Sequence, residues 1–226
     1  QETPDQDGLA HFLEHMCFNG TKNFPDKKIL DYLQSIGASF GGNVNASTGV
    51  EQTIYMLTNI PLVNETVVDT CILIMHDYSH FVTNDPTEID KERGVIIEER
   101  RQRRNASWRL HEKSLPYYYG DSKYAGCTLI GSQENLESFK PESLVNFYRT
   151  WYRPDMQAVV EGVLLLVVAH IGEVAGLDRI ALVVELHELR GDMRLILVRK
   201  PVADHHLTAA GETFLIFFRI RKGHVT

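Results

Sequence analysis

Cysteine is scarce in this chain of 226 residues, which contains only Cys17, Cys71 and Cys127. They are odd in number and far apart, so no disulfide framework of the kind that holds small secreted domains together is indicated. Isolated cysteines are more often small buried apolar residues. The fold must therefore depend on a hydrophobic core, for which an apolar content of 43% and a charged content of 23% are ordinary.

Long apolar runs and an excess of positive charge are also missing. The longest apolar run, 163–169, is far too short to span a bilayer, and no signal peptide is recognisable. A net charge of −7 argues against a nucleic-acid partner, because no surplus of Lys and Arg is left to neutralise phosphates. The length suits one sizeable domain or two small ones. Since the chain opens on Gln1 rather than Met, we expect a processed or fragmentary product.

The most informative stretch is 8–16, which reads GLAHFLEHM. In a helix, His11 and His15 lie on one face, one turn apart, so both imidazoles can reach a single zinc ion. Glu14 sits at the edge of that face, close enough to a metal-bound water to accept its proton. This is the H-x-x-E-H pattern of the inverzincins. The alternative is an ordinary helix in which the two histidines are partly exposed and paired with Glu14.

A strand over 52–58 is predicted by alternating, β-branched residues. The preceding stretch, 38–49, is rich in Gly, Asn and Ser, which by itself favours a loop. If it is instead an edge strand, its unpaired backbone groups could accept an extended peptide.

A long helix is predicted from Asp85 as N-cap through the arginines at 100–104. Ile89, Glu92, Ile96 and Glu99 fall at intervals of three, four and three, so two carboxylates share a face that otherwise looks buried. Because a buried carboxylate is costly unless it meets a cation, this helix is the natural place for a third metal ligand. The alternative, a solvated Glu and Arg face, fits Glu98 and the arginines better.

Other elements follow from the same signals. Helical spacing predicts three helices before residue 80, one up to about Phe18, one after Pro25 and one through 67–78. A loop is expected over 114–131. It is followed by a short helix at 132 and a longer helix from Pro141. Strands are predicted over 156–168, 180–186, 194–198 and 214–220. His76 and His80 are also four apart, but with no acidic partner arranged around them we expect surface or rim histidines. We expect no metal role for the unaccompanied His170, His205 and His206.

Together these pieces resemble the insulinase/pitrilysin metallopeptidases. The segment 8–21 is similar to that family's zinc helix, and four later landmarks arrive in the family's order. The landmarks are Asn45–Thr48, Glu92–Glu99, Gly131-Ser132 and the run from Asn146 to Asp155. The match covers roughly 5–160.

The resemblance implies an α+β domain with a mixed or antiparallel sheet and helices packed on one face. It implies that His11, His15 and Glu99 ligate one Zn²⁺ and that Glu14 is the general base. It also implies that Glu92 orients a ligand histidine, and that Asn45 and Ala46 hold the substrate as an added strand.

The resemblance further implies a zinc-dependent endopeptidase that hydrolyses peptides or unfolded polypeptide segments, with a second homologous domain or half as partner. It suggests a periplasmic or cell-envelope location in a bacterium. We expect a catalytic domain over 1–160, with 161–226 as its divergent or artefactual remainder, because the resemblance stops at about Glu161. The alternative function is a zinc-binding but inactive fragment or partner-binding subunit. A zinc lyase of the S-ribosylhomocysteine type is disfavoured, since Cys127 lies in no ligand pattern.

Overall fold

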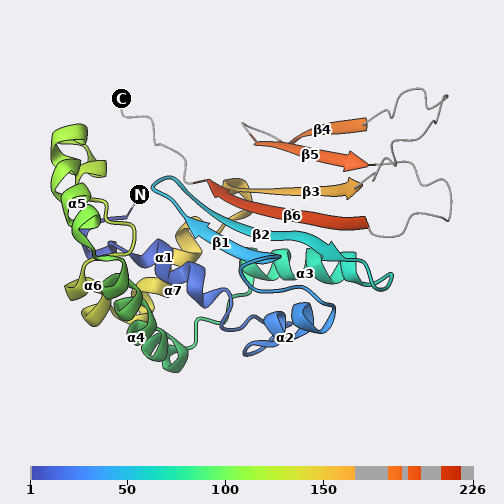
Figure 1. Cartoon of the computed structure of the whole chain (residues 1–226), viewed down its shortest axis with the longest axis horizontal. Coiled ribbons are helices and arrows are strands. Elements are labelled where there is room, and N and C mark those ends of the chain that lie inside the picture. The colour runs from blue at the N-terminus through green and yellow to red at the C-terminus, as the bar shows by residue number, and fades with distance from the viewer. Residues whose placement is uncertain (1, 166–182, 190–192, 200–209, 220–226) are drawn as a thin grey trace.

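Six strands form one mixed sheet in the order β1-β2-β6-β3-β5-β4 (Figure 1). This computed structural model describes residues 2–165, 183–189, 193–199 and 210–219. Neighbouring strands are antiparallel except β3 and β5, which are parallel. The strands are β1 (Val44–Thr48), β2 (Gln52–Pro61), β3 (Gln157–Leu165), β4 (Val183–Leu189), β5 (Met193–Arg199) and β6 (Ala210–Arg219).

The edge position of β1 confirms the edge-strand alternative for 44–48, whereas 38–43 form the loop that the Gly-rich composition favoured. The four later strands occur close to their predicted positions, although 166–168, 180–182 and residue 220 lie outside the described residues. His170, His205 and His206 also lie outside them. Since β6 lies between β2 and β3, segments from both ends of the chain share one sheet.

Helices gather on one side of the sheet in Figure 1, as expected for the α+β class, and α1 and α3 contact its strands. In the described part of the chain they are α1 (Leu9–Met16), α2 (Lys28–Ser35), α3 (Val67–His80), α4 (Pro86–Arg103), α5 (Ala106–Tyr119), α6 (Gln133–Ser138) and α7 (Pro141–Trp151). Among these described helices, none is both long enough and apolar enough to cross a bilayer.

The expectation of a loop over 114–131 is wrong for its first six residues, because α5 continues to Tyr119. Asn105 caps this helix by accepting a hydrogen bond from the Trp108 amide at 3.0 Å. Pro116 lies inside α5, and the helix ends at Gly120, whose φ is 53°. Pro116 falls in the last turn of the helix, where it removes one intrahelical hydrogen bond without ending the helix.

Helix α1 lies at the centre of the core. Leu9, Phe12, Leu13 and Met16 are at most 1% exposed, and α1 contacts α4, α7, β1 and β2. Burying four large apolar side chains contributes about 1.5–3 kcal/mol each. The face of α1 that carries the histidines is therefore held by the core on the opposite face.

The start of α1 is fixed by close backbone packing. Gly8 has a φ of 93°, and a Cβ added there would lie 2.6 Å from Cα of Gly131. The Nε of Arg100 on α4 donates to the Gly131 carbonyl at 2.9 Å. The same loop thus contacts the beginning of α1 and the end of α4, which helps set the register between the two helices.

Candidate metal centre

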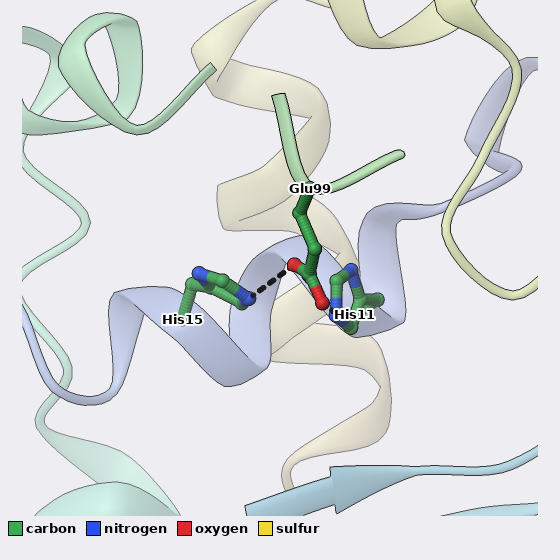
Figure 2. A group of neighbouring side chains, drawn as sticks. All are labelled: His11, His15 and Glu99. Atoms are coloured by element: carbon green, nitrogen blue, oxygen red, sulfur yellow. Dashed lines mark ion pairs between the residues drawn. The ribbon is translucent and has the colours of Figure 1, made fainter. Parts of the chain in front are cut away.

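Three potential metal ligands from two helices converge (Figure 2). Nε2 of His15 lies 3.3 Å from Oε2 of Glu99, and Nε2 of His11 lies 3.6 Å from the same oxygen. One ligand atom from each residue lies within 4.8 Å of the other two. This is the set expected from the sequence, and it can hold a metal ion.

The donor set fits zinc in chemistry, and both histidine–glutamate distances fit its spacing. Two atoms that each lie about 2.0–2.2 Å from one tetrahedral ion are about 3.3–3.6 Å apart, which matches both nitrogen–oxygen distances. Oε2 of Glu99 is buried, makes no well-aligned hydrogen bond among the described residues, and has His15 as its cationic neighbour. A metal ion bound here would replace the His15 proton beside a buried charge that needs a cation. Two imidazoles and a carboxylate are also a known catalytic zinc set, which leaves one position open.

Glu92 contacts His15 on the ring nitrogen opposite the one that faces Glu99. Its Oε1 lies 2.8 Å from Nδ1 of His15. A carboxylate in this position fixes the imidazole tautomer and directs the Nε2 lone pair toward the metal position. Although burial raises the pKa of Glu92, hydrogen bonds from His15 and Asn19 hold it below its usual value. The family resemblance implied this role for Glu92, and it stays a prediction that needs the contact seen here.

The two histidines have opposite pKa shifts. Burial, and next the charge of His15, lower the pKa of His11 to about 4, so this imidazole is neutral near pH 7. Burial also lowers the pKa of His15, but Glu92 and Glu99 outweigh it and raise the value to about 9. In the metal-free chain, His15 is therefore an imidazolium between two carboxylates, and a metal would replace its proton.

Arg103 holds the second oxygen of Glu99. Its Nη2 lies 2.5 Å from Oε1 of Glu99, one helical turn away on α4. His15 and the other neighbouring cationic groups keep the pKa of Glu99 below its usual value despite partial burial. Glu98, by contrast, is exposed and pairs with Arg101 and Gln102. The structure therefore places Glu99, not Glu98, at the metal group.

Glu14 approaches the same region from α1 and meets strand β1. Its Oε2 accepts a hydrogen bond from the hydroxyl of Thr48, which leaves Oε1 without a described hydrogen bond. Burial raises the pKa of Glu14, and the Thr48 hydroxyl opposes that rise. A carboxylate with a raised pKa and one available oxygen is suited to receive and return a proton.

The outer edge of β1 presents backbone groups of Ala46. The Gly49 amide donates to Gln52 at 2.8 Å, and the Thr58 amide donates to Asn43 at 2.7 Å. Hydrogen-bonded pairs alternate along an antiparallel ladder, so Ala46, paired with Tyr55, directs its N–H and C=O away from β2. Oδ1 of Asn45 accepts from the Ala46 amide at 2.9 Å. These predicted substrate-binding residues therefore lie at an edge that can accept a strand.

Comparison with known proteins gives the family of the chain. Residues 1–121 match the family described as insulinase, peptidase family M16. The chain belongs to the insulinase family. It is 34% identical over 163 residues to the probable zinc protease PqqL of Escherichia coli, covering 72% of this chain and 17% of that protein. The beta subunit of the human mitochondrial-processing peptidase is 30% identical over 155 residues, which cover 67% of this chain and 29% of the subunit.

Solved structures of insulinase-family proteins share the fold. The first half of the periplasmic protease PqqL from Escherichia coli superposes with a TM-score of 0.64 at 34% identity, covering 69% of this chain and 33% of that structure. The longer PqqL structure gives a TM-score of 0.65 and is covered to 17%. This insulinase-family chain thus spans about a sixth of the length of its PqqL relatives.

Sequence reasoning did not assign roles to Asn19, Thr48 or Arg103 in this insulinase-family site. Of these three, only the contact of Arg103 could have been predicted from the sequence, because Arg103 lies four residues after Glu99 on a helix. The contacts of Asn19 with Glu92 and of Thr48 with Glu14 join residues 73 and 34 positions apart. His76 and His80, for which no metal role was expected, are exposed on α3 and lie outside the metal group found in the described residues.

Proposed function

We propose that this chain is the zinc-binding catalytic domain of an endopeptidase that hydrolyses peptides or unfolded polypeptide segments through a metal-activated water. One observation carries the proposal: His11, His15 and Glu99 converge as a group that could hold a metal ion, while Glu14 lies on the same helix as the histidines. Membership of a family whose relatives are called zinc proteases supports it.

The reaction would divide between the metal group and Glu14. Zinc, when bound by His11, His15 and Glu99, supplies Lewis-acid activation of water and of the scissile carbonyl. Oε1 of Glu14 takes the proton from the attacking water and returns it to the leaving amine. Oε2 stays on the Thr48 hydroxyl, which keeps the carboxylate in one orientation.

The substrate would be held as a strand added to the edge of β1. The N–H and C=O of Ala46 would pair with the peptide backbone, and the Asn45 amide, which now caps the Ala46 N–H, would move to another peptide group. Main-chain pairing gives affinity with little sequence selectivity, which suits a peptidase of unfolded segments.

A second homologous domain or half would be the partner of this chain and would complete the substrate-binding site. The supporting fact is that this chain covers only 17% of the PqqL relatives. The assignment of 1–160 to the catalytic domain and of 161–226 to its remainder stays a prediction. A periplasmic or cell-envelope location is also proposed, because PqqL is described as periplasmic.

The test is the zinc content of the full chain beside that of Glu99→Gln and Glu98→Gln, with cleavage of a pool of unstructured peptides in parallel. We expect about one zinc per chain in the wild type and in Glu98→Gln, and none in Glu99→Gln. Cleavage by the zinc-loaded chain would support the peptidase. Zinc without cleavage would favour the alternative of an inactive fragment or a partner-binding subunit. A wild-type chain without zinc would overturn the metal site.

A further inference from the structure

We propose that Asn19 is a positioning residue for the metal centre, acting on His15 through Glu92. Nδ2 of Asn19 donates a hydrogen bond to Oε2 of Glu92 at 2.7 Å. The other oxygen of the same carboxylate, Oε1, lies 2.8 Å from Nδ1 of His15. The inference rests on the proposed zinc site, which it extends by one residue.

The three residues form a closed circuit. Asn19 follows the end of α1 by three residues, and its backbone amide donates to Met16 at 3.0 Å. The segment just after His15 therefore supplies Asn19, which contacts the same Glu92 carboxylate that contacts His15. Glu92 comes from α4, so the circuit also joins the two helices that supply the metal ligands.

Asn19 controls the orientation of the Glu92 carboxylate. The terminal torsion of a glutamate is broad, so a carboxylate held at one oxygen can rotate and weaken its contact with the imidazole. A second hydrogen bond at Oε2 restricts that rotation. Because the amide is neutral and donates only from nitrogen, Asn19 stabilises the ionised carboxylate without adding a cation that would oppose zinc.

The Asn19 side chain makes little other contact with the described residues. Its remaining described contact runs from Nδ2 to Sδ of Met16 at 3.9 Å, and thioether sulfur is a weak acceptor. Replacing Asn19 by leucine, which has a similar shape, should therefore change the orientation of Glu92 more than the stability of the chain.

The test is a double-mutant cycle on the full chain, with Asn19→Leu made in the wild type and in a Glu92→Ala background. The zinc dissociation constant is measured by competition with a chelator, and the melting temperature is measured without metal. In the wild-type background we expect zinc binding to weaken about tenfold, the lower end for an outer hydrogen-bond partner. In the Glu92→Ala background we expect no further loss. Equal losses in both backgrounds, or no loss in either, would overturn the inference.

A second readout works on the metal-free chain, so failure of the zinc site would not decide this inference. Nuclear magnetic resonance can follow exchange with solvent of the proton on Nδ1 of His15. We expect Asn19→Leu to speed that exchange about tenfold, because a freely rotating Glu92 protects the proton less. An unchanged exchange rate would contradict the role of Asn19, whether or not the wild type binds zinc.

Discussion

The hydroxyl of Thr48, the last residue of strand β1, donates a hydrogen bond to Oε2 of Glu14 on helix α1. The strand proposed to hold the peptide is thereby joined to the carboxylate proposed to move the proton. A peptide that pairs with Ala46 would lie two residues from this contact on the same strand. Substrate placement and orientation of the base thus depend on one edge strand.

Replacing Thr48 by valine should slow peptide cleavage about 10–100-fold, since a hydrogen bond to a charged group is worth about 1.5–3 kcal/mol. Loss of the donor also raises the pKa of Glu14 further, so the acid limb of the pH–rate profile should move to higher pH. Thr48→Ser keeps the hydroxyl and is the matched control, with most of the activity retained. Zinc content should be equal in all three proteins. An equal loss of cleavage activity in Thr48→Val and Thr48→Ser would rule out a role for the Thr48 hydroxyl in orienting Glu14.

Zinc binding should strengthen with pH because it displaces the proton from His15. Between pH 7 and the metal-free pKa of about 9, the apparent association constant should rise about tenfold per pH unit and then level off. His11, with a pKa of about 4, adds no proton competition in this range. Calorimetry at pH 7 in two buffers of different ionisation enthalpy should show about one proton released per zinc. Affinity that does not change from pH 7 to 9 would argue against an imidazolium at His15.

Chelation should lower the melting temperature of the zinc-loaded chain. A metal that binds only the folded state stabilises it by about 4 kcal/mol at a free concentration 1,000 times its dissociation constant. For a chain of this size that corresponds to roughly 10 °C. Glu99→Gln should melt at the same temperature with and without chelator. An equal shift in wild type and variant would place the stabilising metal elsewhere.

Gly8 and Gly94 should respond in opposite ways to alanine. At Gly8 the positive φ and the 2.6 Å approach of a new Cβ to Gly131 should cost about 1–3 kcal/mol. Gly94 lies within α4, where an added Cβ would meet nothing within 4 Å. Alanine there should therefore stabilise the chain by about 0.5–1 kcal/mol. Denaturant unfolding of Gly8→Ala and Gly94→Ala without metal would measure both changes in the free energy of unfolding. A Gly8→Ala chain as stable as the wild type would contradict the close packing of Gly8 against Gly131.

Local sequence patterns predicted much of the fold and the set of potential metal ligands. Helical spacing alone put His11 and His15 on one face, and the Asp85 cap with apolar residues at 89 and 96 put Glu92 and Glu99 on one face of α4. Periodicity also placed most helices and strands. It failed at α5, where a loop was expected from residue 114 although the helix continues to Tyr119.

The sequence by itself thus determined the chemistry on each element, because a residue's position on a helix face follows from a spacing of three or four. Only the tertiary structure decided which faces meet. It placed β1 at the sheet edge, Thr48 on Glu14 and Asn19 on Glu92, contacts that span 34 and 73 positions. Such pairs depend on how α1, α4 and β1 pack around a shared core, and no short-range periodicity records that packing.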